Sequence, residues 1–245
     1  MSSSKKKVKI SRKLNLFNLP HHIGIILDGN GRWATKRGLP RSMGHKAGCE
    51  NIKKIVEHIF DLGIKCATFF MFSTENWKRP KEEVDNIFEI ARGYIHENLD
   101  RFVERGVKIV TMGDIDKLPK DLRDKLHEGI ERTKNCDKFI LNLAINYGGR
   151  DEILRATNEA IKQGKILKKQ EDFQKLLYSA DLPDPDFIIR TSGEMRISNF
   201  MLYQMAYSEF LFSPILWPDF NEKQLQKALI NFQRRKRRFG GLNKK

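Results

Sequence analysis

Two kinds of hydrophobic pattern alternate along the chain and predict its secondary structure. Short apolar runs without charges are typical of strands buried in a parallel sheet, and longer segments with apolar residues three or four positions apart are typical of amphipathic helices. The short runs predict strands at residues 23–27, 67–72, 107–111, 139–146, 187–189 and 209–212. The longer segments predict helices at residues 47–60, 81–105, 120–133, 150–163, 171–178, 200–207 and 221–237.

Strands that alternate with helices predict an α/β fold with right-handed crossovers between parallel strands. We expect a single domain with a central, mostly parallel sheet of about six strands, flanked by about seven helices. The 245 residues, of which 40% are hydrophobic, are enough for one such core, and the sequence contains no internal repeat or long linker.

Three polar loops follow predicted strands, at residues 28–33, 73–80 and 190–199. The carboxyl ends of parallel strands meet at one edge of a sheet, where ligands bind, so we expect the loops to form one site. In the first loop Gly29 and Gly31 let main-chain N–H groups point at an anion, and Arg32 adds a permanent positive charge. An ordinary strand-to-helix turn explains the glycines equally well. The adjacent carboxylate of Asp28 shifts the balance toward a diphosphate with its divalent cation.

Basic side chains recur in and near these loops: Arg32, Arg79, Arg190 and Arg196, with Arg41 and His45 close behind the first loop. One surface arginine is weak evidence. Several at one sheet edge favour a substrate with many phosphate oxygens, since each charge-assisted contact contributes about 1.5 to 3 kcal/mol. The sequence has neither Gly-x-x-x-x-Gly-Lys-Ser/Thr nor Gly-x-Gly-x-x-Gly, which argues against a nucleotide cofactor.

The formal net charge of +15 is concentrated at the two ends of the chain. Residues 1–13 and 234–245 together hold thirteen Lys and Arg and no Asp or Glu, so the rest of the chain is nearly neutral. A solvated tail is the simpler explanation for residues 1–13, and attraction to an anionic membrane is the alternative. A basic module that binds nucleic acid or membrane through its tails is therefore our second functional hypothesis. The near-neutral body argues against it, and we expect no nucleic-acid partner.

The sequence also indicates where the protein resides. No apolar run approaches the length of a membrane span, and residues 1–13 lack the apolar centre of a secretory signal. We expect a cytoplasmic protein, with peripheral contact at the inner face of the membrane as the further option that the tails allow. Cys49, Cys66 and Cys136 lie far apart without metal-ligand spacing, so we expect neither disulfides nor a structural zinc site.

The polar loops and several further blocks resemble the cis-prenyltransferases, most closely the undecaprenyl diphosphate synthases. The matching blocks are residues 21–33, 44–48, 72–80, 146–150, 190–200, 217–220 and 234–241. The resemblance implies repeated cis-condensation of isopentenyl diphosphate with an allylic diphosphate, usually farnesyl diphosphate. The implied product is a long polyprenyl diphosphate such as undecaprenyl diphosphate, the lipid-carrier precursor for cell-wall or glycan synthesis. No Asp-Asp-x-x-Asp motif occurs, which separates the chain from the all-helical trans-prenyl synthases.

The resemblance also implies roles for individual residues. Asp28 and Asn76 are the expected catalytic residues, and Mg²⁺ is the expected cofactor, held by Asp28 and Glu209. An amide is a poor base, so we expect Asn76 to position the substrate while a substrate phosphate or Asp28 accepts the proton. Met195 stands where relatives often have a metal-binding histidine, and a thioether is a poor Mg²⁺ ligand. The expected substrate-binding residues are Gly29, Asn30, Gly31, Arg32, Trp33, Arg41, His45, Ser73, Thr74, Glu75, Trp77, Arg79, Arg190, Arg196, Ile197 and Ser198.

Assembly and product binding are further expectations from the resemblance. Relatives are usually homodimers, and Arg238 and Gly240 match an Arg-x-Gly motif that reaches the partner's isopentenyl diphosphate site. The wide apolar face of residues 81–105, together with Met71, is expected to line a hydrophobic tunnel, with plain core packing as the alternative for most of these residues. A non-catalytic subunit of the family is a third reading, but such subunits lack an equivalent of Asp28. We divide the chain into a basic tail, residues 1–13, and a catalytic domain, residues 14–245.

Overall fold

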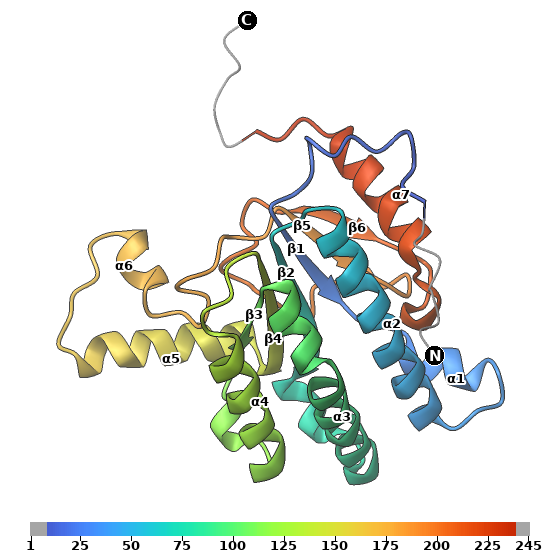
Figure 1. Ribbon diagram of the computed structural model, residues 1–245. Coiled ribbons are helices and arrows are strands. Elements are labelled where there is room, and N and C mark those ends of the chain that lie inside the picture. The colour runs from blue at the N-terminus through green and yellow to red at the C-terminus, as the bar shows by residue number, and fades with distance from the viewer. Residues whose placement is uncertain (1–8, 239–245) are drawn as a thin grey trace, which may run out of the picture.

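Six parallel strands form one sheet in the computed structural model, which describes residues 9–238 (Figure 1). The strands are β1 (His22–Ile26), β2 (Cys66–Ser73), β3 (Val107–Met112), β4 (Phe139–Tyr147), β5 (Phe187–Arg190) and β6 (Glu209–Phe212). Their spatial order is β3-β4-β2-β1-β5-β6, and every neighbouring pair is parallel. The predicted α/β class and strand number are thus confirmed, with a sheet that is wholly parallel in the described part of the chain.

Seven α-helices connect and flank the strands in the described part of the chain. They are α1 (Asn30–Thr35), α2 (Arg41–Asp61), α3 (Lys81–Arg105), α4 (Lys120–Thr133), α5 (Gly149–Lys162), α6 (Gln170–Gln174) and α7 (Glu222–Gln233). Short 3₁₀ helices lie at Thr74–Lys78, Ile115–Lys117 and Trp217–Asp219. Within residues 9–238, no helix has both the length and the apolar character that crossing a membrane requires.

Alternating strand residues point into two hydrophobic cores, one on each face of the sheet. Ile25, Phe69 and Ile189 belong to the larger core, which α2, α3, α4 and α7 cover. In Figure 1, α2, α3 and α4 lie in front of the sheet, and α5 extends away from it with α6 near its far end. The smaller core contains Ile26 and Ile188 and is closed mainly by the segment 197–205. The sheet is therefore buried on both faces, as its uninterrupted apolar runs predict.

The register of the central strands brings their carboxyl ends together. Ile26 of β1 lies opposite Phe70 of β2 on one side and Arg190 of β5 on the other. The pairing of β2 with β4 shifts between Phe70 and Ser73, and such bulges re-aim side chains next to active sites. All three polar loops therefore start at the same sheet edge.

Two helices match the sequence prediction at both ends, and others do not. Residues 81–105 and 120–133 are helical as expected. The helix expected at 200–207 is wrong: the segment forms a series of turns, because Ser198, Asn199 and Met201 all have positive φ. The segment 171–178 is helical only to Gln174, and the last helix ends at Gln233, before the basic residues expected to extend it.

A buried histidine links the central strands on the smaller-core side. Asn142 Nδ2 donates to Thr68 Oγ1 at 3.0 Å, and Thr68 Oγ1 lies 2.7 Å from His22 Nε2. His22 Nδ1 lies 2.6 Å from the carbonyl oxygen of Pro183, which can only accept, so Nδ1 carries the proton and Nε2 accepts from the threonine hydroxyl. Burial lowers the pKa of His22 from 6.5 to about 4, partly offset by the Pro183 carbonyl. His22 is therefore neutral at physiological pH.

We predict that His22 contributes to acid sensitivity. An unfolded chain binds a proton at His22 near pH 6.5 and the folded chain only near pH 4, so this contribution to stability is complete above pH 6.5 and declines as the pH falls toward 4. The loss is on the order of 3 kcal/mol over that window. Urea unfolding of wild type and His22→Gln at several pH values should show a smaller pH dependence in the variant. Exposed His96→Gln is the control, and equal pH dependence in wild type and His22→Gln would contradict the prediction.

Candidate functional site

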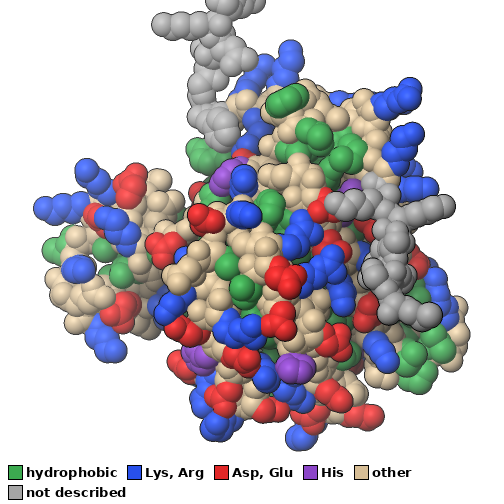
Figure 2. Space-filling view, in the orientation of Figure 1, with side chains coloured by type: hydrophobic (Ala, Val, Ile, Leu, Met, Phe, Trp, Pro, Cys, Tyr) green, Lys and Arg blue, Asp and Glu red, His purple; other side chains and the backbone are tan. Residues whose placement is uncertain are grey.

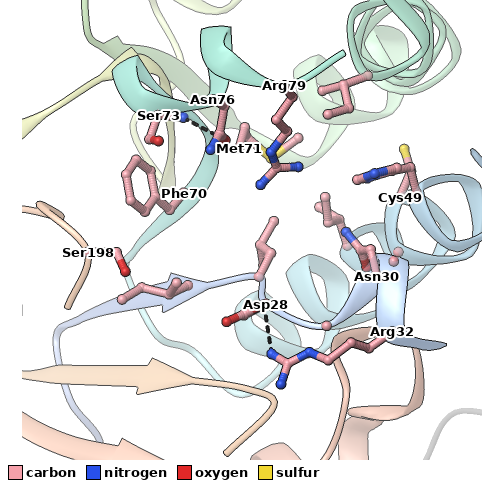
Figure 3. A pocket seen from close by; sticks show the side chains of 18 of the residues that line it. Asp28, Asn30, Arg32, Cys49, Phe70, Met71, Ser73, Asn76, Arg79 and Ser198 are labelled. Carbon is pink, nitrogen blue, oxygen red and sulfur yellow. Dashed lines mark hydrogen bonds and ion pairs between the residues drawn. The ribbon is translucent and has the colours of Figure 1, made fainter. Parts of the chain in front are cut away.

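A pocket of about 420 Å³ opens at the carboxyl edge of β1, β2 and β5 (Figure 3). Its lining has a polar mouth and an apolar wall, and α2 and β2 contribute to both. Its polar and glycine lining residues are Asp28, Gly29, Asn30, Gly31, Arg32, Arg41, His45, Gly48, Ser73, Asn76, Arg79, Arg190, Arg196 and Ser198. Its apolar wall includes Cys49 and Ile52 of α2, Met71 of β2, and Ile87 and Ile90 of α3.

Asp28 lies at the centre of the polar mouth, held between two arginines. Its Oδ2 accepts from Arg190 Nη2 at 2.8 Å, and its Oδ1 accepts from Arg32 Nη2 at 3.2 Å. Its main-chain oxygen accepts from Thr191 Oγ1 at 2.7 Å and from Trp217 N at 3.0 Å. Burial alone would raise the pKa of Asp28, but hydrogen bonds from Arg190 and Ser192 and the arginine charges lower it below its usual value. The carboxylate is therefore ionised near neutral pH.

Through its bond with Arg190, Asp28 contributes to the stability of the fold as well as to the site. The Arg190 side chain is only 4% exposed, and it also donates from Nη1 to Ser198 Oγ at 2.7 Å and to the Arg196 carbonyl. A strand-end carboxylate would ordinarily contribute little to the core, but removing this one would leave a buried guanidinium without its anion. We therefore expect loss of Asp28 to lower stability as well as activity.

The loop after β5 supplies a second group of charges. Arg32 Nη2 donates to Ser192 Oγ at 2.5 Å, and Arg32 Nη1 donates to Glu194 Oε1 at 2.9 Å. Glu194 Oε2 pairs with Arg196 Nη1 at 2.5 Å. Ser192, Ser198 and Gly193 have positive φ, so the loop turns sharply enough to return Ser198 to Arg190. The first and third polar loops thus form one hydrogen-bonded unit.

Glycines allow the first loop to approach its neighbours closely. Gly29 has φ 111°, and a Cβ there would lie 2.9 Å from Leu216. A Cβ on Gly31 would lie 2.6 Å from the Arg41 guanidinium. Gly48 is equally constrained, because a Cβ there would lie 2.3 Å from Asn30 Oδ1. The first turn of α1 also leaves N–H groups without intrahelical acceptors at the pocket, as a glycine nest requires.

Glu83 joins three of the basic residues on the opposite side of the pocket. Its carboxylate accepts from Arg41 Nε and Nη2, both at 3.0 Å, and from Arg79 Nη1 at 3.0 Å. His45 Nε2 lies 3.1 Å from Glu83 Oε1. Burial would raise the pKa of Glu83, but its bonds to Arg41 and His45 lower it to about 2. Burial lowers the pKa of His45, and Glu83 acts in the opposite direction.

Asn76 is fixed by the backbone of the second loop. Its Oδ1 accepts from Ser73 N at 3.1 Å, and the Ser73 side chain in turn accepts from the Asn76 backbone, which is a reciprocal capping box (Figure 3). Both residues line the pocket. The amide oxygen of Asn76 is therefore already used, which agrees with a positioning role better than with a role as a base.

Five of the expected substrate-binding residues lie outside the pocket lining. Trp33 Nε1 donates to Asp219 Oδ1, Thr74 Oγ1 to Asp151 Oδ2, and Trp77 Nε1 to Asn146 Oδ1, each at 2.8 Å. Glu75 accepts from Asn199 Nδ2 at 2.8 Å, and Ile197 packs against the smaller core. These side chains hold the loops together in this structure, and direct substrate contact by them stays a prediction.

Apart from Asp28, the expected metal and partner-subunit residues within the described chain do not line the pocket. Glu209 begins β6 opposite Phe187, at the amino edge of the sheet, and pairs with Arg235 at 2.8 Å. Asp28 lies at the carboxyl edge, so one chain places the two carboxylates at opposite edges of the sheet, and Mg²⁺ binding by Asp28 and Glu209 stays a prediction. Met195 is 80% exposed and does not line the pocket. Arg238 is exposed at the end of the described chain, and Gly240 lies outside the described residues.

Sequence reasoning missed Glu83, Ser192 and Glu194, which orient the basic side chains. The sequence carries one signal for Glu83, because Arg79 and Glu83 are four residues apart at the start of a helix. No comparable signal marks Glu194, whose partner Arg32 lies 162 residues away. Chemically, the pocket combines oriented guanidinium groups and one ionised carboxylate with an adjoining apolar wall. It suits a ligand with a polyanionic head and a hydrocarbon tail.

Comparisons with known proteins agree with this geometry. A family model described as "Putative undecaprenyl diphosphate synthase" matches residues 26–240. An isoprenyl transferase of Clostridium tetani is 49% identical to the chain, over 98% of this chain and 97% of that protein. A lavandulyl diphosphate synthase from Lavandula x intermedia, solved in complex with dimethylallyl diphosphate, has TM-score 0.88 and 33% identity, over 91% of this chain and 99% of that one. A probable undecaprenyl diphosphate synthase from Campylobacter jejuni has TM-score 0.77 and 35% identity, over 91% and 100% of the two chains.

We predict that Glu83 sets the protonation of His45. In Glu83→Gln the hydrogen bond to a carboxylate and its charge are lost, while burial and the Arg41 and Arg79 charges remain, so the pKa of His45 should fall further. NMR titration of the His45 ring measures this directly. Glu82→Gln, an exposed neighbour, is the matched control. A His45 pKa that is equal in wild type and Glu83→Gln would show that the cluster does not control this ring.

Proposed function

The chain belongs to the family of undecaprenyl diphosphate synthases, and from that premise we propose that it extends an allylic diphosphate by repeated cis-condensation with isopentenyl diphosphate. It is a prenyltransferase by its relatives, and farnesyl diphosphate and undecaprenyl diphosphate are the proposed primer and product. The observation that carries the proposal is the pocket in which Asp28 lies between two arginines, beside an apolar wall. A diphosphate head and a prenyl tail match these two parts.

The allylic diphosphate is proposed to bind at the first loop, beside Arg32, Arg41, His45 and Arg79. Breaking its allylic C–O bond leaves a diphosphate anion and a delocalised cation. Donors already aimed at the leaving oxygens stabilise that charge without reorganising during the reaction. Arg41 and Arg79 are held in place by Glu83, so they are oriented before the substrate arrives.

Isopentenyl diphosphate is proposed to bind at the third loop, with its phosphates on Arg190, Arg196 and Ser198. Asp28 bonds to Arg190 and Arg32, which serve the two sites, so it sets the distance between the sites. The double bond of isopentenyl diphosphate attacks the allylic cation, and loss of a proton completes the step. Asn76 positions the reacting carbons. Because the pKa of Asp28 is lowered, its carboxylate is a weak base, and we favour a phosphate oxygen as the proton acceptor.

The residues present fit a Mg²⁺ ion that substrate phosphates help to hold. Asp28 is the only carboxylate among the described pocket-lining residues, and the described residues contain no cluster of three or more His, Cys, Asp or Glu for a metal. Mg²⁺ commonly binds one or two carboxylates together with substrate phosphates and water. A carboxylate offers about four lone pairs, so Asp28 has sites beyond its two arginine bonds. When bound, the ion supplies positive charge for the leaving diphosphate.

The growing tail is proposed to extend along the apolar wall between α2 and α3. Each CH₂ group of the tail that is buried there contributes about 0.8 kcal/mol to binding of the product, so product release slows as the chain grows. We further propose a homodimer in which Arg238 and Gly240 of one copy reach the isopentenyl diphosphate site of the other. The enzyme is proposed to act in the cytoplasm, with peripheral contact at an anionic membrane that receives the product.

The central test replaces Asp28 in the assay of farnesyl diphosphate with labelled isopentenyl diphosphate and Mg²⁺. Asp28→Asn keeps the side chain's shape and removes its charge, and we expect kcat to fall by about 10²-fold to 10³-fold. Asp28→Ala should in addition lower the midpoint of urea unfolding, because Arg190 loses its anion. Exposed Asp85→Asn is the control. Near-normal turnover in Asp28→Asn, or no polyprenyl product from wild type, would overturn the assignment.

A second test concerns product length. Met71 lies on the apolar wall and is only partly buried, so it narrows the path of the tail. We expect Met71→Ala to lengthen the product by one or a few five-carbon units, measured by mass spectrometry of the polyprenyl diphosphates. The same product distribution in wild type and variant would remove Met71 from the control of chain length.

A further inference from the structure

The first described residues form a strap, residues 9–20, that is hydrogen-bonded along α7. Ser11 N donates to Gln226 Oε1 at 2.8 Å, and Gln226 Nε2 donates to the Lys9 carbonyl at 3.4 Å. The buried side chain of Leu14 fixes the middle of the strap in the larger core. In Figure 1 the strap and α7 run side by side at the upper end of the molecule. They form one continuous surface.

The strap carries an exposed apolar tip at Leu16 and Phe17. Asn15 Oδ1 accepts from Phe17 N at 2.9 Å, and Gln233 Nε2 donates to the carbonyls of Asn15 and Asn18 at 2.6 and 2.7 Å. These bonds fix the turn, yet Phe17 is fully exposed and Leu16 is 44% exposed. The turn therefore presents two large apolar side chains to solvent in a defined position, without a groove of the same chain to receive them.

Exposed cations lie along the strap and α7 on the same surface as this tip. The strap and residues 221–238 contain one carboxylate, Glu222, and the exposed basic residues Lys9, Arg12, Lys13, Lys223, Lys227, Arg234, Lys236 and Arg238. None of these eight forms an ion pair with another described residue, whereas the partly buried Arg235 and Arg237 of the same segment pair with Glu209 and Asp186. Figure 2 shows blue and green side chains over this end of the molecule, while red and blue are interspersed below.

We propose that the strap and the exposed side of α7 dock onto an anionic lipid bilayer. Leu16 and Phe17 enter the boundary between headgroups and acyl chains. The cations contact the anionic headgroups, apart from Arg238, which the proposed dimer places at the partner's isopentenyl diphosphate site. This proposal assigns the membrane contact of the proposed function to a particular surface, and its biological purpose rests on that proposed function.

A bilayer fits this surface better than two other partners do. A nucleic acid would use the cations, but it offers no apolar layer for Leu16 and Phe17. A second copy placed on this surface by a two-fold axis would bring the same eight cations face to face, which is unfavourable. An anionic bilayer offers both an apolar layer and negative charge.

The position of the surface agrees with the direction of the pocket. α2 and α3 both start at the carboxyl edge, where Arg41 lines the pocket and pairs with Glu83, and run toward the amino edge of the sheet. Along α2, apolar Cys49 and Ile52 follow basic Arg41 and His45. The strap leads into the amino end of β1 at His22, so its tip at Leu16 and Phe17 lies on the amino-edge side of the sheet. Docking through the tip leaves the pocket mouth open to water-soluble diphosphates. The apolar wall of the pocket then extends from the mouth toward the side of the molecule that faces the lipid.

The experiment is flotation of the full chain with vesicles. We compare phosphatidylcholine vesicles with vesicles containing about 30% phosphatidylglycerol, at low and at about 0.5 M salt. Wild type should float only with the anionic vesicles, less at high salt. Leu16→Ser combined with Phe17→Ser, and separately Lys223→Glu combined with Lys227→Glu, should each weaken binding by about tenfold or more. Matched controls on another face are Ile166→Ser, at an 87% exposed apolar side chain, and Lys165→Glu combined with Lys168→Glu.

Each result bears on the surface itself. Binding that the strap and α7 variants leave unchanged would overturn the proposal, as would equal losses in the control variants. Tighter binding to a single-stranded oligonucleotide than to anionic vesicles, lost in the lysine variant alone, would assign the cations to nucleic acid. A changed oligomeric state of the tip variant in light scattering, with normal flotation, would assign the tip to a second copy. Flotation requires no turnover, so its failure is distinguishable from failure of the prenyltransferase assignment.

Discussion

The bonds of Arg190 with Asp28 and Ser198 are the constraint on which the site depends. A guanidinium that is 4% exposed loses most of its hydration, a cost of several kcal/mol that only an anion and well-placed acceptors offset. Because β1 and β5 are adjacent and parallel, Asp28 arrives beside Arg190 without any adjustment of the sheet. The third loop then has to turn back through residues with positive φ to bring Ser198 to the same guanidinium. Fold and site are therefore stabilised by the same bonds.

The fold was predictable where one hydrophobic period extended over many residues. The helix at 81–105 has a long apolar face and starts after Pro80, so its pattern and its boundary agree. The segment 200–207 shows why a shorter pattern fails. Phe200, Met201 and Met205 have helical spacing, yet their burial in the smaller core is achieved by turns. The chain turns at residues 198–201 so that Ser198 can bond to Arg190. Arg190 lies outside the segment, so the local pattern gives no sign of these turns.

The site was predictable to the extent that strand ends define it. Asp28, Arg190 and the glycines follow from the rule that parallel strands place their carboxyl ends together. The same rule already separated Glu209 from Asp28, because Glu209 begins its predicted strand whereas Asp28 follows the end of its own. Glu83 and Glu194 were not predictable in their roles, since a carboxylate on a helix or loop gives no sign in the sequence of which distant arginine it will contact.

These carboxylates determine which ligands the pocket can select. Arg32, Arg41 and Arg79 already have anionic partners in Glu194 and Glu83. The free energy of binding a ligand is therefore only the difference between its own contacts and the contacts that it replaces. A single carboxylate would exchange one such contact for another of similar strength. A diphosphate brings more charge and more acceptor oxygens than the side chain it displaces, and it can engage several guanidiniums and the loop N–H groups at once. The carboxylates thus keep the arginines oriented and compensate part of their positive charge in the free protein. Replacing these carboxylates is favourable only for a polyanionic ligand.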